Sequence, residues 1–258
     1  MKKYILSAAV VLSSLTASAQ DSWQKYGPTC DSDFGFLVRA GYVLGGTTPL
    51  PVPSEIRAIN EFNPIGGASV GVEAYKMFTK RWGVKTGLHF FHEGFHTAAE
   101  VKGYQMTIDM DGESLSGYFT GTDVTNTSMV GLTVPLLANF RISPRWNVSL
   151  GPYFSTYFKT QFDGEVYENS AGQGYLRVGD PTGQKVEMTK GSATYDFGDN
   201  MRKWGVGMEL QLDWQALRRM NVFAQVDWST TSAVDPAFTA VAFPMYPVYA
   251  TLGLAYRY

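Results

Sequence analysis

Residues 204–215, WGVGMELQLDWQ, decide the fold class of this chain because they sort into two faces with a period of two. Apolar side chains occupy every second position, and the positions between them hold glycine or polar residues. A helix repeats its faces every ~3.6 residues, whereas a strand turns successive side chains to opposite faces. The stretch therefore predicts a β-strand with one apolar face, which comprises Trp204, Val206, Met208, Leu210, Leu212 and Trp214.

The same alternation recurs along the chain and predicts eight strands. They are expected at 33–44, 66–78, 82–96, 127–142, 145–160, 202–216, 220–231 and 246–258. Short turns at 79–81, 143–145 and 217–219 alternate with long connections at 45–65, 97–126, 161–201 and 232–245. Pro135 lies inside a predicted strand, and we expect a bulge there because proline cannot donate a ladder hydrogen bond.

Aromatic residues mark both ends of the apolar faces and favour a membrane barrel over a soluble barrel with an apolar interior. Trp82, Trp146 and Trp214 lie beside the short turns, and Phe90, Phe154 or Phe158, and Trp204 lie about ten residues away. Ten residues at ~3.3 Å each, tilted by about 40°, rise roughly 25 Å, which is the height of a lipid-facing band. Short turns at one end and long loops at the other are typical of outer-membrane barrels.

The fold class that follows is an all-β, antiparallel up-and-down transmembrane β-barrel with short periplasmic turns and long extracellular loops. Eight strands are expected. Ten strands are the alternative, because residues 103–121 and 174–189 each have the pattern of a hairpin, which would either stand above the membrane or widen the barrel.

The polar faces carry charges of both signs, which we expect to pair inside a narrow barrel as an ionic plug. An eight-strand barrel is just wide enough to be filled by its own side chains, so an open pore is not expected. The predicted interior charges are Arg39, Glu73, Lys85, Glu93, Arg141, Lys159, Glu209, Asp213, Asp227 and Arg257.

Residues 92–96, His92-Glu93-Gly94-Phe95-His96, match the H-E-x-x-H pattern of zinc proteases. That chemistry needs a helix, because positions i and i+4 lie roughly 13 Å apart in a strand. The preceding residues alternate with period two, so a strand is predicted and the zinc protease is rejected. His92 and His96 are expected near a strand end or loop, with metal capture by His89, His92 and His96 as a further possibility.

The N-terminus predicts export. Residues 1–19 place Lys2 and Lys3 before a short apolar run and end in Ala17-Ser18-Ala19, which is typical of a cleaved signal peptide. Residues 20–32 are expected to be a flexible segment and residues 33–258 the outer-membrane β-barrel. The formal net charge of −2, without a basic cluster, argues against nucleic-acid binding.

With its strands placed, the chain resembles the PorT-like outer-membrane β-barrel family of Bacteroidota. The resemblance rests on TASAQ, on VGLTVPLLANFRIS followed by WNVSLGPYFSTYF, on YDFGDNMRKWGVGMELQL, and on the closing LGLAYRY. It implies an outer-membrane location and a small up-and-down barrel, and it carries over no catalytic residues.

The predicted function is therefore a non-enzymatic outer-membrane barrel with a scaffold, surface-contact or secretion-accessory role. We expect no catalytic, cofactor-binding or metal-binding residues and no cofactor. The expected partners are outer-membrane lipids, the barrel-assembly machinery, and extracellular or periplasmic proteins of unknown identity. The alternative is an outer-leaflet hydrolase with a rim site near His92, which would need Ser128 or Ser155 as nucleophile and an orienting carboxylate.

Overall fold

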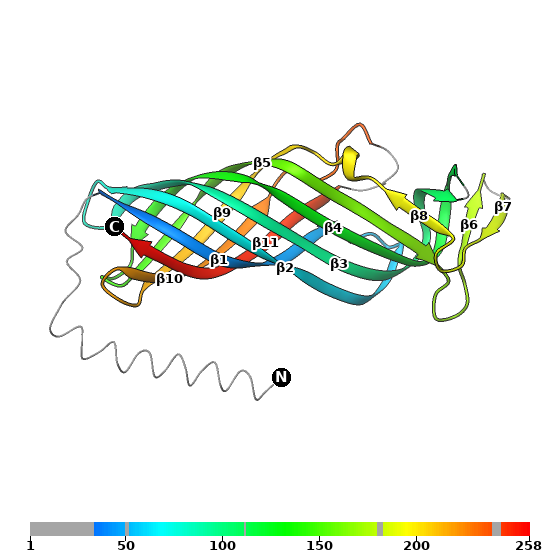
Figure 1. Cartoon of the computed structure of the whole chain (residues 1–258), viewed down its shortest axis with the longest axis horizontal. Coiled ribbons are helices and arrows are strands. Elements are labelled where there is room, and N and C mark those ends of the chain that lie inside the picture. The colour runs from blue at the N-terminus through cyan, green and yellow to red at the C-terminus, as the bar shows by residue number, and fades with distance from the viewer. Residues whose placement is uncertain (1–33, 50–51, 111, 180–182, 239–243) are drawn as a thin grey trace, which may run out of the picture.

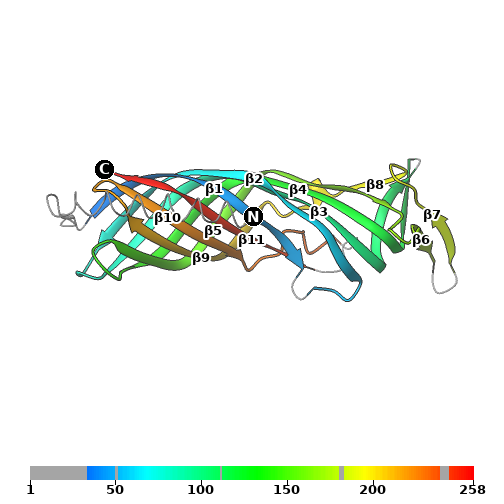
Figure 2. The same cartoon turned by 90° about the horizontal axis from the view of Figure 1, so that it is seen from below.

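The computed structural model describes residues 34–49, 52–110, 112–179, 183–238 and 244–258. Its long strands form an elongated barrel in which every strand slopes across the long axis (Figures 1 and 2). The predicted signal peptide and the segment 20–32 lie outside the described residues. The barrel strands are β1 (Phe34–Pro49), β2 (Ile56–Met77), β3 (Trp82–Met110), β4 (Glu113–Arg141), β5 (Trp146–Tyr167), β9 (Trp204–Gln215), β10 (Met220–Ser229) and β11 (Met245–Arg257).

These strands pair antiparallel in chain order, and β1 closes the ring by pairing with β11. The ring has eight strands, as the sequence predicted, and the ten-strand alternative is wrong. Residues 103–110 and 113–121 form the tip of the β3–β4 hairpin instead of widening the ring. The second predicted hairpin is β6 (Tyr175–Val178) with β7 (Gln184–Glu187), which pairs with the edge of β4.

The three short turns lie together at one end of the barrel, where β11 also ends (Figure 1). Thr79 shapes the first turn by accepting a hydrogen bond from the Trp82 N–H at 2.9 Å. In the third, the Leu217 N–H donates to the Met220 carbonyl at 3.0 Å. We call this the turn end, and the opposite end the long-strand end.

At the long-strand end, strands are found where loops were predicted. Residues 97–126 are almost entirely strand, because β3 and β4 are each 29 residues long, and β2 extends over 22 residues to Ile56. We call the outer parts of four strands, together with three short strands, the extension. It comprises residues 56–66 of β2, 95–110 of β3, 113–127 of β4 and 160–167 of β5, with β6, β7 and β8 (Ala193–Asp196). The rest of the ring is the trunk. The 3₁₀ helix η1 (Gly198–Asn200) follows β8.

One glycine shapes the extension. Gly103 has a φ of +67°, and the β3–β4 register shifts by one residue between Lys102 and Tyr104. The Gly103 N–H donates to the Thr120 hydroxyl at 3.1 Å, so the bulged backbone stays satisfied. The bulge moves the inward side chains of β3 from odd positions to even ones, such as Tyr104 and Met106.

The predicted bulge at Pro135 is wrong, and a bulge lies elsewhere on the same pair of strands. Pro135 stands opposite Tyr153, and the register is the same before and after it. The shift falls between Val130 and Gly131, which leaves Phe158 as the extra residue of β5. Phe158 and Lys159 are consequently both exposed. Lys159 therefore lies outside the barrel, contrary to its predicted interior position.

The two parts of the barrel pack in opposite senses. Trunk strands expose their large apolar side chains, such as Leu210 at 47%, while their polar side chains are buried. The extension instead buries an apolar core that includes Met106, Ile108 and Phe119. Within the described residues, no helix is long and apolar enough to cross a membrane.

Candidate functional site

The middle of the trunk interior is filled by a cluster of paired charges. Arg39 donates to both Glu73 and Gln225, and its guanidinium lies 3.8 Å above the centre of the Phe223 ring. Lys85 donates to Asp213 at 2.6 Å and lies 3.7 Å from Glu73. Arg39, Glu73, Lys85 and Asp213 are each at most 2% exposed. This interior ion cluster closes the bore with side chains, as predicted from the alternating charges.

The other predicted interior charges lie above and below this cluster, with Lys159 as the exception. Glu209 is fully buried and stands opposite Asp227 across the β9–β10 pair. Glu93 and Asp227 line a cavity of about 30 Å³ on the long-strand side of the cluster. Arg141 and Arg257 are half-buried and line a smaller cavity toward the turn end.

Glu73, His89 and Glu209 are close enough to be tested as a metal centre, because their ligand atoms lie within 4.8 Å of one another. The electrostatics do not favour a cation there. Arg39 and Lys85 already pair with Glu73, and the His89 Nε2 atom lies 3.2 Å from a Glu73 oxygen. The donor set fits an ion-paired interior better than a divalent metal ion.

The three histidines do not converge. His89 is buried inside the trunk, whereas His92 and His96 lie on the outer face of β3. Shared metal capture by the three is therefore wrong. Residues 92–96 are strand, as predicted, which removes the helix that zinc-protease chemistry requires. They lie in mid-strand and not near a strand end, because β3 continues to Met110.

The predicted rim site is partly assembled. The His92 Nε2 atom lies 3.1 Å from the Ser128 hydroxyl on the outer face, so one half of a nucleophile and base pair is present. In the described parts of the chain, Ser128 is the hydrogen-bond partner of the His92 ring, and no carboxylate contacts that ring. Ser155 is inside the barrel and bonded to Thr133 at 2.7 Å, so it does not reach His92.

A carboxylate on the outer face is linked to the other histidine, His96, and not to His92. Asp163 accepts a hydrogen bond from Asn126 at 3.4 Å, and Asn126 is bonded to the His96 Nδ1 atom at 2.7 Å. Gln161 also donates to Asp163, at 2.6 Å. These contacts run along the outer face of β3, β4 and β5 and leave His92 outside them.

Exposed aromatic side chains ring both ends of the trunk. At the turn end, the Trp146 and Trp214 rings stack with centroids 6.1 Å apart, and Trp82 packs on Phe140 at 4.7 Å. At the other end Phe90, Phe154, Phe158, Trp204 and Trp228 are exposed. Both predicted aromatic bands are therefore present on the outer surface.

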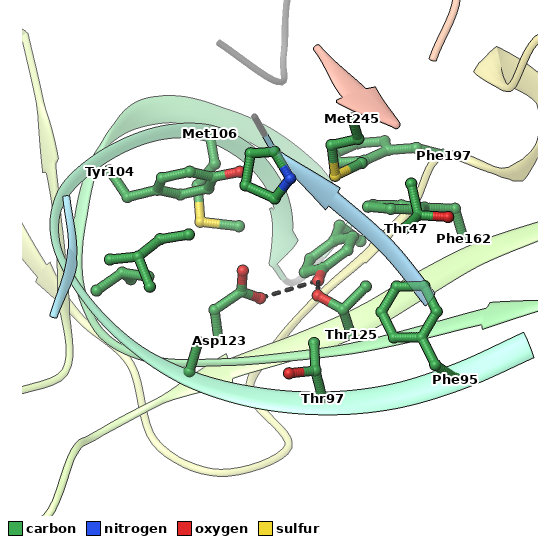
Figure 3. A pocket seen from close by; sticks show the side chains of 15 residues that line it. Thr47, Phe95, Thr97, Tyr104, Met106, Asp123, Thr125, Phe162, Phe197 and Met245 are labelled. Carbon is green, nitrogen blue, oxygen red and sulfur yellow. Dashed lines mark hydrogen bonds between the residues drawn. The ribbon is translucent and has the colours of Figure 1, made fainter. Parts of the chain in front are cut away.

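A cavity of about 90 Å³ lies inside the long-strand end. Fifteen residues from β1–β5, β8 and the segments around Phe197 and Met245 line it, and most are apolar or aromatic (Figure 3). Phe162 and Phe197 stack at 6.2 Å, and Phe197 stacks on Tyr195 at 5.1 Å, so aromatic faces form one wall. We call this the extension cavity.

One acidic group faces the extension cavity. Asp123 accepts a hydrogen bond from the Tyr195 hydroxyl at 2.8 Å, and Tyr195 in turn is bonded to the Thr125 hydroxyl at 2.7 Å (Figure 3). Burial raises the pKa of Asp123 to about 6, and the hydrogen bond from Tyr195 opposes that rise. Burial also raises the pKa of Tyr195 and Tyr104, so both phenols stay neutral.

The sequence did not reveal this site. Asp123 and Tyr195 lie in stretches that were predicted to be loops, and β8 is held near Asp123 by pairing with the end of β5 and with Asp109 of β3. Alternation at Phe119, Gly121 and Asp123 was the available signal. It was missed because the extension turns its apolar residues, such as Phe119, inward, opposite to the trunk.

The closed ring, the apolar outer face between aromatic bands and the ion-filled interior define a transmembrane β-barrel. A family model described as "Outer membrane protein beta-barrel domain" matches residues 18–235. The chain belongs to this family, and its location is the outer membrane. The turn end is accordingly the periplasmic end, and the extension lies on the extracellular side.

Solved structures of other outer-membrane proteins match the chain at low identity. Ail, the attachment invasion locus protein of Yersinia pestis, solved with the heparin analogue sucrose octasulfate, is 13% identical with a TM-score of 0.42, covering 88% of this chain and 100% of that one. Neisserial surface protein A is 9% identical with a TM-score of 0.34, covering 88% and 98%. OprG of Pseudomonas aeruginosa is 14% identical with a TM-score of 0.31, covering 87% and 95%. No curated protein matches the chain.

Proposed function

We propose that this chain is a non-enzymatic outer-membrane protein whose barrel anchors a surface-contact module, the extension. The observation that carries the proposal is the apolar core of the extension, which includes the fully buried Phe119 and Leu176. Flexible loops would need no such core. A packed core outside the lipid band holds β6 and β7 in fixed positions, as a recognition surface requires.

The filled interior supports an anchoring role for the trunk. The contacts of Arg39 and Lys85 with Glu73 and Asp213 occupy the bore, so side chains take the space a solute would need. The tip also carries residue types that are enriched in protein interfaces. Tyr118 is exposed, and Arg177 stands opposite it in a groove that Tyr175 and Lys102 also line.

The experiment is a shortening of the hairpin tip. Residues 107–116 are replaced by an Asn-Gly turn, which keeps Tyr104 and Met106, and cells bearing either chain are tested for attachment to glycan-coated, protein-coated and cell-coated surfaces. The full chain is expected to confer attachment, and the shortened chain to lose most of it while still inserting as a heat-modifiable barrel. Lys80→Glu, at the periplasmic end, is the control and should change nothing.

Attachment that survives the shortening, or a full chain that confers none on any surface, would overturn the surface-contact role. Scaffold and secretion-accessory roles would then be favoured, since they depend on the periplasmic face or the barrel wall. The resemblance to the PorT-like family of Bacteroidota fits a secretion-accessory role. The same proposal includes export through a signal peptide cleaved after Ala19, insertion by the barrel-assembly machinery, and contact with outer-membrane lipids.

A second candidate, an outer-leaflet hydrolase, is favoured by one contact: the 3.1 Å between the His92 imidazole and the Ser128 hydroxyl. It is ranked lower because Asp163 is bonded to Asn126 and not to His92. Hydrolysis of phospholipid vesicles by the purified chain, lost in both His92→Ala and Ser128→Ala and kept in His96→Ala, would establish it. Vesicles that stay intact with every chain would exclude it for that substrate.

A further inference from the structure

The extension cavity has the composition of a binding site for a small organic cation. Its wall is apolar and aromatic apart from threonines, tyrosines and the single carboxylate of Asp123. None of the fifteen lining residues carries a positive charge. The cavity thus differs from the interior ion cluster, where Arg39 and Lys85 balance the acids.

A hydrogen bond holds the Asp123 carboxylate in position, but no positively charged residue of the cavity lining neutralises it. One of its oxygens accepts the hydrogen bond from Tyr195, and Thr125 holds the Tyr195 hydroxyl in place. In the described residues no hydrogen bond reaches the second oxygen, which is directed into the cavity toward the side of Tyr104 and Met106 (Figure 3). Asp123 is half-buried, and a carboxylate that is partly removed from water and has no countercharge is stabilised by a cation that reaches it.

The aromatic side chains offer a second contact for a cation. Phe95 and Phe162 face the cavity, with Tyr195 and Phe197 beside them, and the faces of such rings attract ammonium groups through their quadrupoles. A carboxylate on one side and aromatic faces on the other therefore suit a positive charge attached to an apolar body. An anion would meet Asp123 without a compensating donor from Lys, Arg or His.

The volume limits the size of the ligand. At about 90 Å³ the extension cavity is smaller than an engineered apolar cavity of about 150 Å³ that binds benzene. A molecule of roughly four to six non-hydrogen atoms fits by this comparison.

We propose that the extension cavity binds a small organic ammonium ion, with the ammonium group on Asp123 and the apolar body against Phe95, Phe162 and Phe197. The proposal does not depend on the surface-contact role. The two are separable, because the tip residues 107–116 lie outside the cavity lining.

The test uses the mature full chain in nanodiscs of zwitterionic phospholipid, with empty nanodiscs subtracted, and isothermal titration calorimetry at pH 7.5. The probes are n-butylammonium, n-butanol and butyrate, which share an apolar chain and differ in charge. Butylammonium is expected to bind at least tenfold more tightly than butanol, and butyrate not to bind. Equal affinity for butylammonium and butanol would overturn the assignment of a cation site.

Substitutions in the cavity lining test where butylammonium binds. Asp123→Asn should weaken butylammonium binding at least tenfold and change butanol binding less than threefold. Ala99→Leu, which fills the cavity, should abolish binding of both, and the exposed Asp109→Asn is the matched control that should change neither. Butylammonium binding that survives both Asp123→Asn and Ala99→Leu would contradict the proposed site.

A measurement on the unaltered chain covers the case in which Asp123→Asn fails to fold. Lowering the pH from 7.5 to 5 protonates Asp123 and should weaken butylammonium binding severalfold, with butanol unaffected. Tyr104 and Tyr195, the other titratable groups in the lining, are neutral throughout this range. Butylammonium binding that is unchanged at pH 5 would argue against Asp123 as the contact.

Discussion

The trunk and the extension are built from the same strands but are packed inside out relative to each other. In β3, Leu88 and Phe90 point to the exterior of the trunk, and Lys85 and His89 point inward. Beyond Glu93 the polarity reverses. Phe95 and Val101 are buried, while outward positions carry polar residues such as Gln105.

One alternating pattern of apolar and polar residues therefore suits two solvents. Against lipid, apolar side chains face outward and polar groups must pair inside. Against water, the same strand follows the ordinary rule and buries its apolar face. The level at which β3 reverses, between Phe90 and Phe95, is therefore the level at which the chain leaves the hydrocarbon.

The largest expected effect comes from breaking the interior ion cluster. Arg39→Met should lower the free energy of unfolding by about 3–5 kcal/mol, because Glu73 is left buried without its main partner. Urea titration in lipid vesicles measures the loss. Adding Glu73→Gln should recover part of it, and Arg81→Met in a turn is the control. A loss below about 1 kcal/mol would mean that the cluster does not hold the trunk together.

The second prediction compares the outer faces of the trunk and the extension. Leu210→Arg, near the middle of the lipid-facing band, should cost about 2–4 kcal/mol of unfolding free energy. Gln105→Arg, on the outer face of the extension, should change it by less than about 0.5 kcal/mol. The same urea titration compares the two variants. A similar loss of unfolding free energy at both sites would contradict the distinction between trunk and extension.

A smaller effect is expected at the bulge. Gly103→Ala should destabilise the extension by about 1–2 kcal/mol, because a Cβ disfavours its φ of +67° although open space surrounds the position. Hydrogen exchange of the amides between Tyr104 and Met110 should accelerate, with trunk amides unchanged. Gln105→Ala is the control, and unaltered exchange in Gly103→Ala would show that the backbone there tolerates a side chain.

The smallest effect concerns pH. The folded pKa of Asp123, about 6, is raised above its unfolded value, so the folded form binds the proton more tightly. Stability of the extension should fall as the pH rises from about 4 to about 6, by on the order of 1 kcal/mol because water screens this half-buried carboxylate. Asp123→Asn should lose this part of the dependence. Thermal unfolding at pH 4.5 and 7 measures it, and parallel curves for the two chains would refute it.

Most of the trunk could be predicted from the sequence. Alternation at residues 204–215 placed β9 within about two residues, and the three short turns were found because charged and small residues interrupt the apolar pattern. Nine of the ten predicted interior charges, all except Lys159, lie inside the barrel. Lys159 was misplaced because the bulge at Phe158, in the same strand, shifts the faces by one, and the prediction continued the alternation through it.

The extension could not be predicted in the same way. Its polar outer face over 97–126 resembles a loop when lipid-facing apolar residues are the criterion, and the short strands β6 and β8 are fixed by pairing with distant strands. The sequence supplied the His92 and Ser128 pair as a candidate. It offered no way to bring Asp123 and Tyr195 together, since that contact depends on the tertiary fold.

Spin labels on outward positions can detect the reversal of packing between trunk and extension. With Cys30 replaced by Ser, single labels are placed at Leu210→Cys in the trunk and Ser116→Cys in the extension, and the chain is reconstituted in lipid vesicles. Oxygen should relax the label at position 210 more than a water-soluble nickel complex does, and the order should reverse at position 116. A label at position 116 with lipid-like access, or one at position 210 with water-like access, would contradict the account.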